Sequence, residues 1–200
     1  MPFQLSSSAS TSYYSDQGTW LEQFLQKSEF NHILVQVPDT YFQESLALLG
    51  LEKIEFYSQA IQLILYDNYD CQPSEQEIIE NAACIVYALA HQRYIRTPQG
   101  LQDTLQLFQN GAYGRCPRIR CGAGMLVYGE HLMPGEGFLK NYCPKCKTLY
   151  DLTQYDEFCV DGCFYGPDFI GMFVATYLEL ADNTSLEEKK KELFGFEIVK

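Results

Sequence analysis

The fold of this chain is decided by two cysteine pairs, Cys116-Pro-Arg-Ile-Arg-Cys121 and, after a gap of 21 residues, Cys143-Pro-Lys-Cys146. Each pair can form a tight turn that directs two sulfurs toward one ion, and the proline after its first cysteine stiffens the turn. Zinc takes four ligands in a tetrahedron and binds thiolates well. Four thiolates leave no open coordination position, so the spacing predicts one structural zinc ion on Cys116, Cys121, Cys143 and Cys146. The alternative, four buried or redox-active thiols, explains the paired spacing poorly.

The composition around this motif is that of a folded protein. The chain has 200 residues and a mass of 23.0 kDa, which is room for one ordinary domain or two small ones. Hydrophobic residues make up 46% and charged residues 20%, which excludes a disordered polymer. No stretch approaches the ~20 apolar residues of a membrane-spanning helix, and the first 18 residues show no secretory signal. We therefore expect an intracellular protein whose eight cysteines are thiols or metal ligands.

The net charge of −12 is unevenly distributed. Residues 1–111 carry 4 basic and 13 acidic side chains, residues 112–150 carry 6 and 2, and residues 151–200 carry 4 and 11. The basic middle segment leaves open a zinc-ribbon module that binds nucleic acid or transcription machinery. However, four thiolates with one Zn²⁺ contribute about −2, and the acidic flanks repel phosphate. Arg115, Arg118 and Arg120 are therefore interpreted as a solvated face or a site for an acidic peptide.

Residues 19–111 carry apolar side chains at helical spacing, which predicts an all-helical domain after a mobile N-terminus over 1–18. Thr19 is a plausible N-cap for the first helix, and a second helix is expected from Pro38 to Gly50. Ser74-Glu75-Gln76-Glu77 has the form of a capping box before a long helix. The expected buried positions of the helices include Trp20, Leu21, Phe24, Leu25, Phe42, Leu46, Leu49, Ile54, Tyr57, Ile61, Ile64, Leu65, Ile78, Ala82, Ile85, Val86, Leu89, Tyr94, Leu101, Leu105 and Phe108.

After Gly111, glycine and proline become frequent and the helical spacing ends. Short apolar runs at Met125–Tyr128 and Leu149-Tyr150 suit strands. The predicted fold class is therefore α+β: the all-helical domain over 19–111, a zinc-ribbon domain with short antiparallel strands over 112–180, and an extended C-terminal tail over 181–200. The tail carries Leu193-Phe-Gly-Phe196, which either packs back on its own domain or forms a hook that inserts into another protein.

The remaining motifs contain no catalytic signature. The sequence has no nucleophile elbow, phosphate-binding glycine loop, kinase motif or metalloenzyme histidine pattern, so no catalytic residue is assigned. Of the three histidines His32, His91 and His131, we interpret His91 as a hydrogen-bonded structural residue. Cys71 and Cys84 are interpreted as unliganded, and Cys159 and Cys163 as two free thiols beside a turn. The sequence therefore indicates a binding or scaffold protein.

Five motifs taken together resemble the regulatory (beta) subunit of casein kinase II. They are Cys116-Pro-Arg-Ile-Arg-Cys121, Met133-Pro-Gly-Glu136, Tyr142-Cys-Pro-Lys-Cys146, Asp161-Gly-Cys-Phe-Tyr-Gly166 and Leu193-Phe-Gly-Phe196. In the helical half, Trp20, Ile61–Leu65 and Tyr87–Thr97 also resemble that family.

This resemblance implies a non-catalytic subunit of a Ser/Thr kinase, present in the cytoplasm and nucleus. It implies a zinc-stapled homodimer that joins two catalytic (alpha) subunits, stabilises them and modulates the choice of protein substrates; membranes and nucleic acid are not expected partners. The same four cysteines are the zinc ligands, and the kinase-docking residues are Leu193, Phe194, Gly195 and Phe196. Pro117, Ile119 and Leu149 match the dimer contact. The family's acidic loop, which binds polycations, corresponds to Asp67, Asp70, Glu75 and Glu77.

Overall fold

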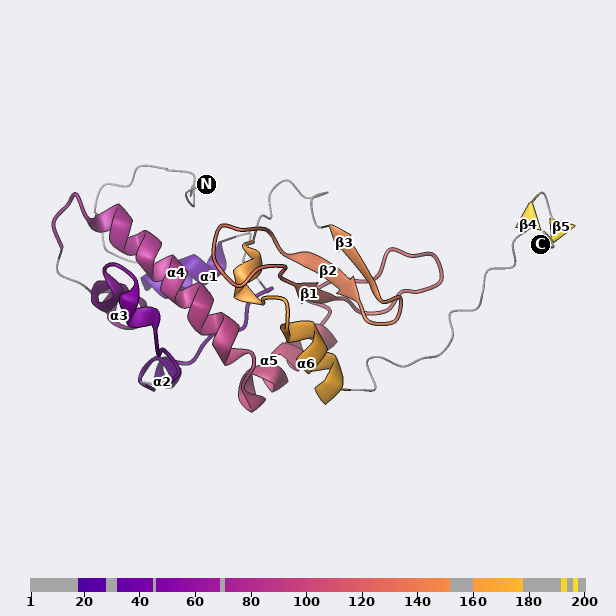
Figure 1. Ribbon diagram of the computed structural model, residues 1–200, viewed down its shortest axis with the longest axis horizontal. Helices are drawn as coiled ribbons and strands as arrows, with labels where there is room; N and C mark the ends of the chain where they lie inside the picture. Colours follow the sequence, from indigo (N-terminus) through magenta and orange to yellow (C-terminus); the bar gives the residue numbers. More distant parts are fainter. Residues whose placement is uncertain are drawn as a thin grey trace.

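The computed structural model describes residues 18–27, 32–44, 46–68, 71–151 and 160–177, together with the backbone of 192–193 and 196–197. The predicted N-terminal segment, apart from Gly18, lies outside these residues. Within them, helices occupy the first half of the chain and a small antiparallel sheet occupies the second half (Figure 1). This arrangement confirms the α+β fold class.

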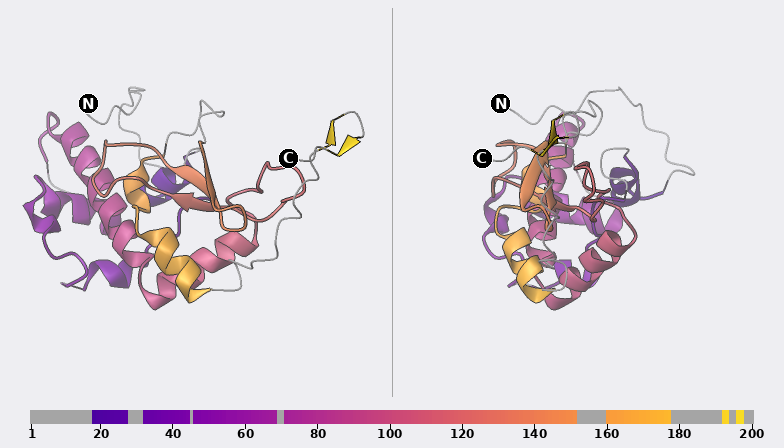
Figure 2. Two further views of the ribbon diagram at one scale, coloured as in Figure 1. Left: turned by 45° about the vertical axis from the view of Figure 1, so that its right-hand side comes forward. Right: turned by 90° about the vertical axis from the view of Figure 1, so that its right-hand side faces the viewer.

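In the described part of the chain, five helices and a 3-10 turn precede the sheet. They are α1 (Trp20–Gln26), α2 (Asp39–Phe42), η1 (Leu51–Lys53), α3 (Tyr57–Tyr66), α4 (Gln76–Tyr94) and α5 (Pro98–Gln109). Helix α4 is the long central element, and α3 packs along it (Figures 1 and 2). Helix α1 begins with a complete capping box, because the Thr19 hydroxyl accepts from the Glu22 N–H and the Glu22 carboxylate accepts from the Thr19 N–H. The predicted cap at Thr19 is therefore confirmed.

The helix predicted from Pro38 to Gly50 is wrong beyond its first turn. Helix α2 ends at Phe42, after which Leu46 and Leu49 are 83% and 65% exposed and Leu48 is buried instead. The guanidinium of Arg93 on α4 donates to the carbonyls of Ala47 and Leu49 at 2.9 and 3.0 Å. Carbonyls that a helix would satisfy internally are thus satisfied by a side chain from a distant element.

The predicted capping box at Ser74 is also wrong. Glu75 is the N-cap of α4 and makes no side-chain cap; its carboxylate accepts instead from the Gln72 N–H at 3.0 Å. The first turn of α4 turns Ile79 inward and leaves Ile78 47% exposed. From Ala82 onward the helix is buried on most sides, so it has no single apolar stripe.

The sheet has the order β1-β2-β3, with β1 (Leu126–Tyr128), β2 (Lys140–Cys143) and β3 (Thr148–Asp151) antiparallel. Cys143 pairs with Thr148, so the cysteine pair Cys143–Cys146 forms the turn between β2 and β3. A second, two-stranded hairpin joins β4 (Glu192–Leu193) to β5 (Phe196–Glu197) near the C-terminus.

One helix of the second half was not predicted. After the 3-10 turn η2 (Gly162–Phe164), α6 (Phe169–Thr176) packs against β1 (Figure 1). Its sequence, Phe-Ile-Gly-Met-Phe-Val-Ala-Thr, is apolar almost throughout, so eight residues give no measurable period. Phe169 and Phe173 are fully buried.

A continuous core joins α4 to the segment around η2. His91 of α4 is fully buried; its Nε2 accepts from the Val35 N–H at 3.1 Å, and its Nδ1 lies 2.9 Å from the Phe164 carbonyl. The interpretation of His91 as a hydrogen-bonded structural histidine is confirmed. The predicted domain boundaries stay predictions. None of the helices in the described ranges is long and apolar enough to span a membrane.

Candidate metal centre

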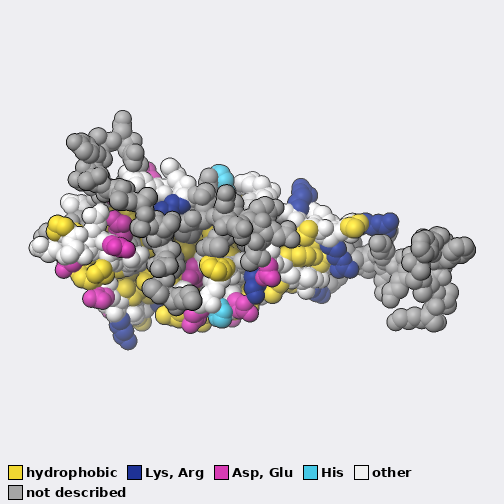
Figure 3. Space-filling view, turned by 90° about the horizontal axis from the view of Figure 1, so that it is seen from above, with side chains coloured by type: hydrophobic (Ala, Val, Ile, Leu, Met, Phe, Trp, Pro, Cys, Tyr) yellow, Lys and Arg dark blue, Asp and Glu magenta, His cyan; other side chains and the backbone are white. Residues whose placement is uncertain are grey.

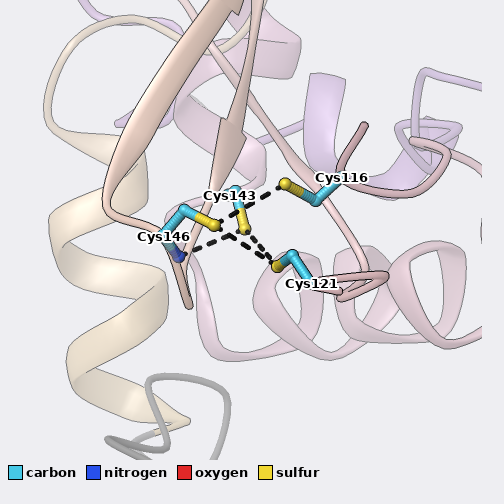
Figure 4. Close-up of side chains that lie close together, drawn as sticks. All are labelled: Cys116, Cys121, Cys143 and Cys146. Carbon is cyan, nitrogen blue, oxygen red and sulfur yellow. Dashed lines mark hydrogen bonds between the residues drawn. The ribbon is translucent and has the colours of Figure 1, made fainter. Parts of the chain in front are cut away.

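The four predicted ligand cysteines meet at one point. Their Sγ atoms lie within 4.8 Å of one another (Figure 4). The β2–β3 turn, which carries two of them, is at the end of the sheet farthest from α4 (Figure 1). Sγ–Sγ distances are 3.7 Å for Cys116–Cys146, 3.7 Å for Cys121–Cys143 and 3.3 Å for Cys121–Cys146. Among the residues that the structure describes, this is the one group of cysteine, histidine or carboxylate side chains arranged to hold a metal ion.

Two backbone turns place these sulfurs. In the second turn, the Lys147 N–H donates to the Cys143 carbonyl at 2.8 Å, and the Cys146 N–H donates to the Cys143 sulfur at 3.3 Å. In the first turn, the Cys121 N–H donates to the Arg118 carbonyl at 2.9 Å. Each turn contains a left-handed residue, Arg120 at φ 68° and Lys147 at φ 54°. The chain thus holds two non-glycine residues in a costly backbone region to close the turns around the sulfurs.

Tyr150 is a fifth residue of the centre. Its hydroxyl lies 3.4 Å from the Cys116 sulfur, although 34 residues separate the two in sequence. The sequence predicts a strand at Tyr150 and indicates no further role for this residue. Its contact follows from the β2–β3 register, which no local motif in the sequence encodes.

The thiols of Cys143 and Cys116 differ in their pKa. Burial raises the pKa of Cys143 to about 12. Burial alone would raise the pKa of Cys116. Hydrogen bonds to its sulfur, of which that from Tyr150 has the largest effect, outweigh burial and lower this pKa to about 7. The hydrogen bond to Cys116 and, secondly, burial raise the pKa of Tyr150, so its hydroxyl keeps its proton. A divalent ion would displace the remaining thiol protons, because thiolates are the form that binds metal.

The surface around the cysteines is basic. Arg115, Arg118, Arg120 and Lys147 are exposed, Lys145 is half-buried, and residues 112–129 contain no carboxylate. Figure 3 shows several lysine and arginine side chains at this end of the molecule. The cations partly offset the negative charge of four thiolates.

The predicted dimer-contact residues lie beside the cysteines and are open to solvent. Pro117 is exposed, Ile119 is 79% exposed and Leu149 is 44% exposed. Their assignment to a dimer contact stays a prediction.

The predicted docking residues lie on and beside the C-terminal hairpin. Leu193 pairs with Phe196 across β4 and β5, and residues 194 and 195 connect the strands. Phe194 and Gly195, and the side chains of Leu193 and Phe196, lie outside the described residues. The docking role therefore stays a prediction.

The predicted acidic-loop residues have local structural contacts. The Asp67 carboxylate accepts from the Trp20 N–H at 2.8 Å, and Glu75 accepts from Gln72 as described above. Glu77 is exposed in the first turn of α4, and Asp70 lies outside the described residues. Binding of polycations by this loop stays a prediction.

The other cysteines lie away from the centre. Cys163 is fully buried, and its N–H donates to the Asp161 carboxylate at 2.8 Å. Cys71 is half-buried and Cys84 is buried on α4, so neither belongs to the cluster. Cys159 lies outside the described residues.

A family model described as casein kinase II regulatory subunit matches residues 19–197 of this chain. The beta subunit of casein kinase II from Schizosaccharomyces pombe is 34% identical over 198 residues, which are 98% of this chain and 84% of that protein. The subunit from Dictyostelium discoideum is 31% identical over 199 residues, which are 98% of this chain and 74% of that protein. Subunit beta-3 from Arabidopsis thaliana is 31% identical over 191 residues, 92% of this chain and 69% of that protein. The chain spans 66% to 85% of the length of curated casein kinase II beta subunits.

Proposed function

This chain belongs to the casein kinase II regulatory subunit family, whose members are non-catalytic, and we propose that it binds and stabilises the catalytic subunit of a Ser/Thr kinase of that type. The family match over residues 19–197 carries the proposal, since it takes in both the metal centre and the C-terminal hairpin. A match of that extent favours a kinase-regulating role over the alternative, a zinc-ribbon module that binds nucleic acid.

Zinc is the ion we assign to the metal centre. A Zn–S distance of about 2.3 Å in a tetrahedron places sulfurs about 3.8 Å apart. Two of the Sγ–Sγ distances here are 3.7 Å, and the cluster consists of four cysteines alone. Cys116, Cys121, Cys143 and Cys146 would hold the ion, which supplies a cross-link between the first turn and the β2–β3 hairpin.

The tail hairpin is the contact we assign to the kinase. Replacing Phe194 and Phe196 together with alanine is expected to weaken binding to a casein kinase II catalytic subunit by ~10² to 10⁴, because burial of two phenylalanines contributes ~3 to 6 kcal/mol. Calorimetric titration of the zinc-loaded chain measures this directly.

The matched control is Phe138→Ala, which removes a phenylalanine that is 57% exposed and lies outside the tail. It should bind like the wild type. No binding by the wild type would overturn the proposed function, whereas equal binding by the double variant would overturn only the tail contact.

In the proposed homodimer, the metal centres of two copies come close together, and Pro117, Ile119 and Leu149 form the contact. Five cations surround the centre, and a Zn²⁺ ion with four thiolates adds about −2, which leaves roughly +3 on each copy. Like charges across the contact repel, and salt screens them over a Debye length of about 10 Å at 0.1 M. Raising the salt concentration should therefore tighten the dimer, by about 1 kcal/mol or roughly fivefold.

Sedimentation equilibrium at low and high salt tests this expectation. Arg120→Gln should reduce the salt dependence, because it removes one exposed cation from the contact. Lys140→Gln should leave the salt dependence unchanged, since Lys140 lies outside that surface. Its Nζ pairs with Glu130 Oε2 at 2.8 Å. A dimer that weakens as salt is added would contradict the proposed contact.

A further inference from the structure

The thiolates of a four-cysteine centre are stabilised by hydrogen-bond donors, because four thiolates and a divalent ion carry an excess of about two negative charges. The Cys143 sulfur obtains one from the backbone, at 3.3 Å from the Cys146 N–H. The Cys116 sulfur has the Tyr150 hydroxyl at 3.4 Å. The backbone N–H of Arg118 also donates to the Cys116 sulfur, so the Tyr150 hydroxyl is a second donor at that sulfur.

The direction of this hydrogen bond is set by chemistry. A metal-bound cysteine is a thiolate and has no proton to give, so the phenol of Tyr150 is the donor. Cys116 is 6% exposed and Tyr150 is half-buried, so the bond is partly shielded from water.

The position of Tyr150 makes the contact specific. Tyr150 pairs with Asn141 across β2 and β3, whereas Cys116 comes from the first cysteine turn. The hydrogen bond therefore joins the two halves of the centre. Neighbouring strand residues point to opposite faces of a sheet, so Leu149 presents its side chain away from the Tyr150 face.

We propose that Tyr150 is a positioning residue of the metal centre, whose hydroxyl donates to the Cys116 thiolate, fixes its orientation and offsets part of its charge. This inference rests on the zinc centre proposed above and adds a ligand-supporting residue to it. Supporting residues of this kind typically contribute 10- to 100-fold to metal affinity.

The test replaces Tyr150 with phenylalanine, which keeps the ring and removes only the hydroxyl. Competition with a chromophoric chelator should show zinc affinity about 10- to 100-fold weaker than in the wild type. Tyr128→Phe is the matched control, since it removes the same group from β1 of the same sheet and should leave the affinity unchanged.

A second readout separates an effect on the sulfur from a loss of packing. Loss of a hydrogen bond makes a thiolate more electron-rich, so in the cobalt-substituted chain the thiolate-to-cobalt charge-transfer band of Tyr150→Phe should move to longer wavelength. The far-ultraviolet dichroism at saturating zinc should match the wild type. Equal zinc affinity together with an unchanged cobalt band would overturn the role of Tyr150. A wild-type chain that binds no zinc would instead overturn the proposed metal centre.

Discussion

Removal of the metal by a strong chelator is expected to unfold residues 112–150 while the helical signal of α1, α3, α4 and α5 persists. Structural zinc contributes ~10 to 16 kcal/mol in small peptides, whereas a whole domain is stable by only ~5 to 15 kcal/mol. Strand β3 adds little to the stability of this segment, because Thr148, Leu149 and Asp151 are all exposed. Without zinc, the turn from Cys116 to Cys121 and the β2–β3 hairpin would lose their common cross-link.

Repulsion between the four sulfurs also predicts that the metal-free segment unfolds. Four sulfurs lie within 4.8 Å of one another, so without an ion they must take up protons or repel each other. Tyr128, Tyr142 and Tyr150 lie in the sheet and report on its packing in the near ultraviolet. We therefore expect the near-ultraviolet dichroism to lose the contribution of these three tyrosines after chelation, whereas the ellipticity at 222 nm decreases only slightly.

Cys143→Ser should reproduce the effect of the chelator, because it removes one ligand at a fully buried position. Cys71→Ser is its control, since Cys71 is half-buried and lies outside the cluster. If the near-ultraviolet spectrum stays unchanged when zinc is removed from the wild type, the ion has no structural role.

The metal centre could be predicted from sequence because its geometry is local. A short spacing between two cysteines closes a turn whatever surrounds it, and the tetrahedral demand of the ion then brings the two turns together. Helix α1 was predictable for a similar reason, since it begins with Thr19, whose hydroxyl accepts from its own first turn.

The features that were missed depend on distant partners. The segment after Phe42 has apolar residues at helical spacing. Its carbonyls nevertheless accept hydrogen bonds from Arg93 of α4 instead of from a helix backbone. Of the positions expected to be buried on α4, only Ile78 is exposed, whereas Ile79 and further residues from other sides of the helix are also buried. Tyr150 reaches Cys116 only through the strand register, which the residues on either side of it do not specify.

Among the residues of the helical half, replacement of His91 should lower the free energy of unfolding the most. Its ring bonds to Val35 and to Phe164, so it ties α4 to two segments that are 56 and 73 residues away in sequence. Its ring also makes edge contacts with Phe164 and Tyr165, at centroid distances of 5.7 and 5.3 Å. The neutral ring with its proton on Nδ1 satisfies both bonds, because Nε2 accepts and Nδ1 donates.

His91→Ala should destabilise the chain by about 5 kcal/mol or more. It leaves the Val35 N–H buried without its ring acceptor, at about 1 to 3 kcal/mol, removes the hydrogen bond to the Phe164 carbonyl, at about 0.5 to 1.5 kcal/mol, and adds the cost of a cavity. Urea unfolding monitored at 222 nm measures the loss. His131→Ala should change stability little, since its side chain is 41% exposed.

The same bonds make stability depend on pH in a predictable direction. Burial lowers the pKa of His91 to about 4, compared with 6.5 in the unfolded chain. As the pH falls below 6.5, the unfolded chain therefore binds a proton at His91 that the folded chain does not bind. The free energy of unfolding decreases until the pH reaches about 4. Between pH 7.5 and about pH 5, this histidine should account for a loss of about 2 kcal/mol.

His91→Gln isolates this contribution, because glutamine keeps hydrogen-bonding capacity and cannot take up the proton. Urea midpoints of the wild type, His91→Gln and His131→Gln are compared at the two pH values, and acid effects on the cysteine centre cancel because all three chains share it. The wild type and His131→Gln should lose about 2 kcal/mol more than His91→Gln. Equal losses in all three chains would mean that His91 does not remain neutral in the folded core.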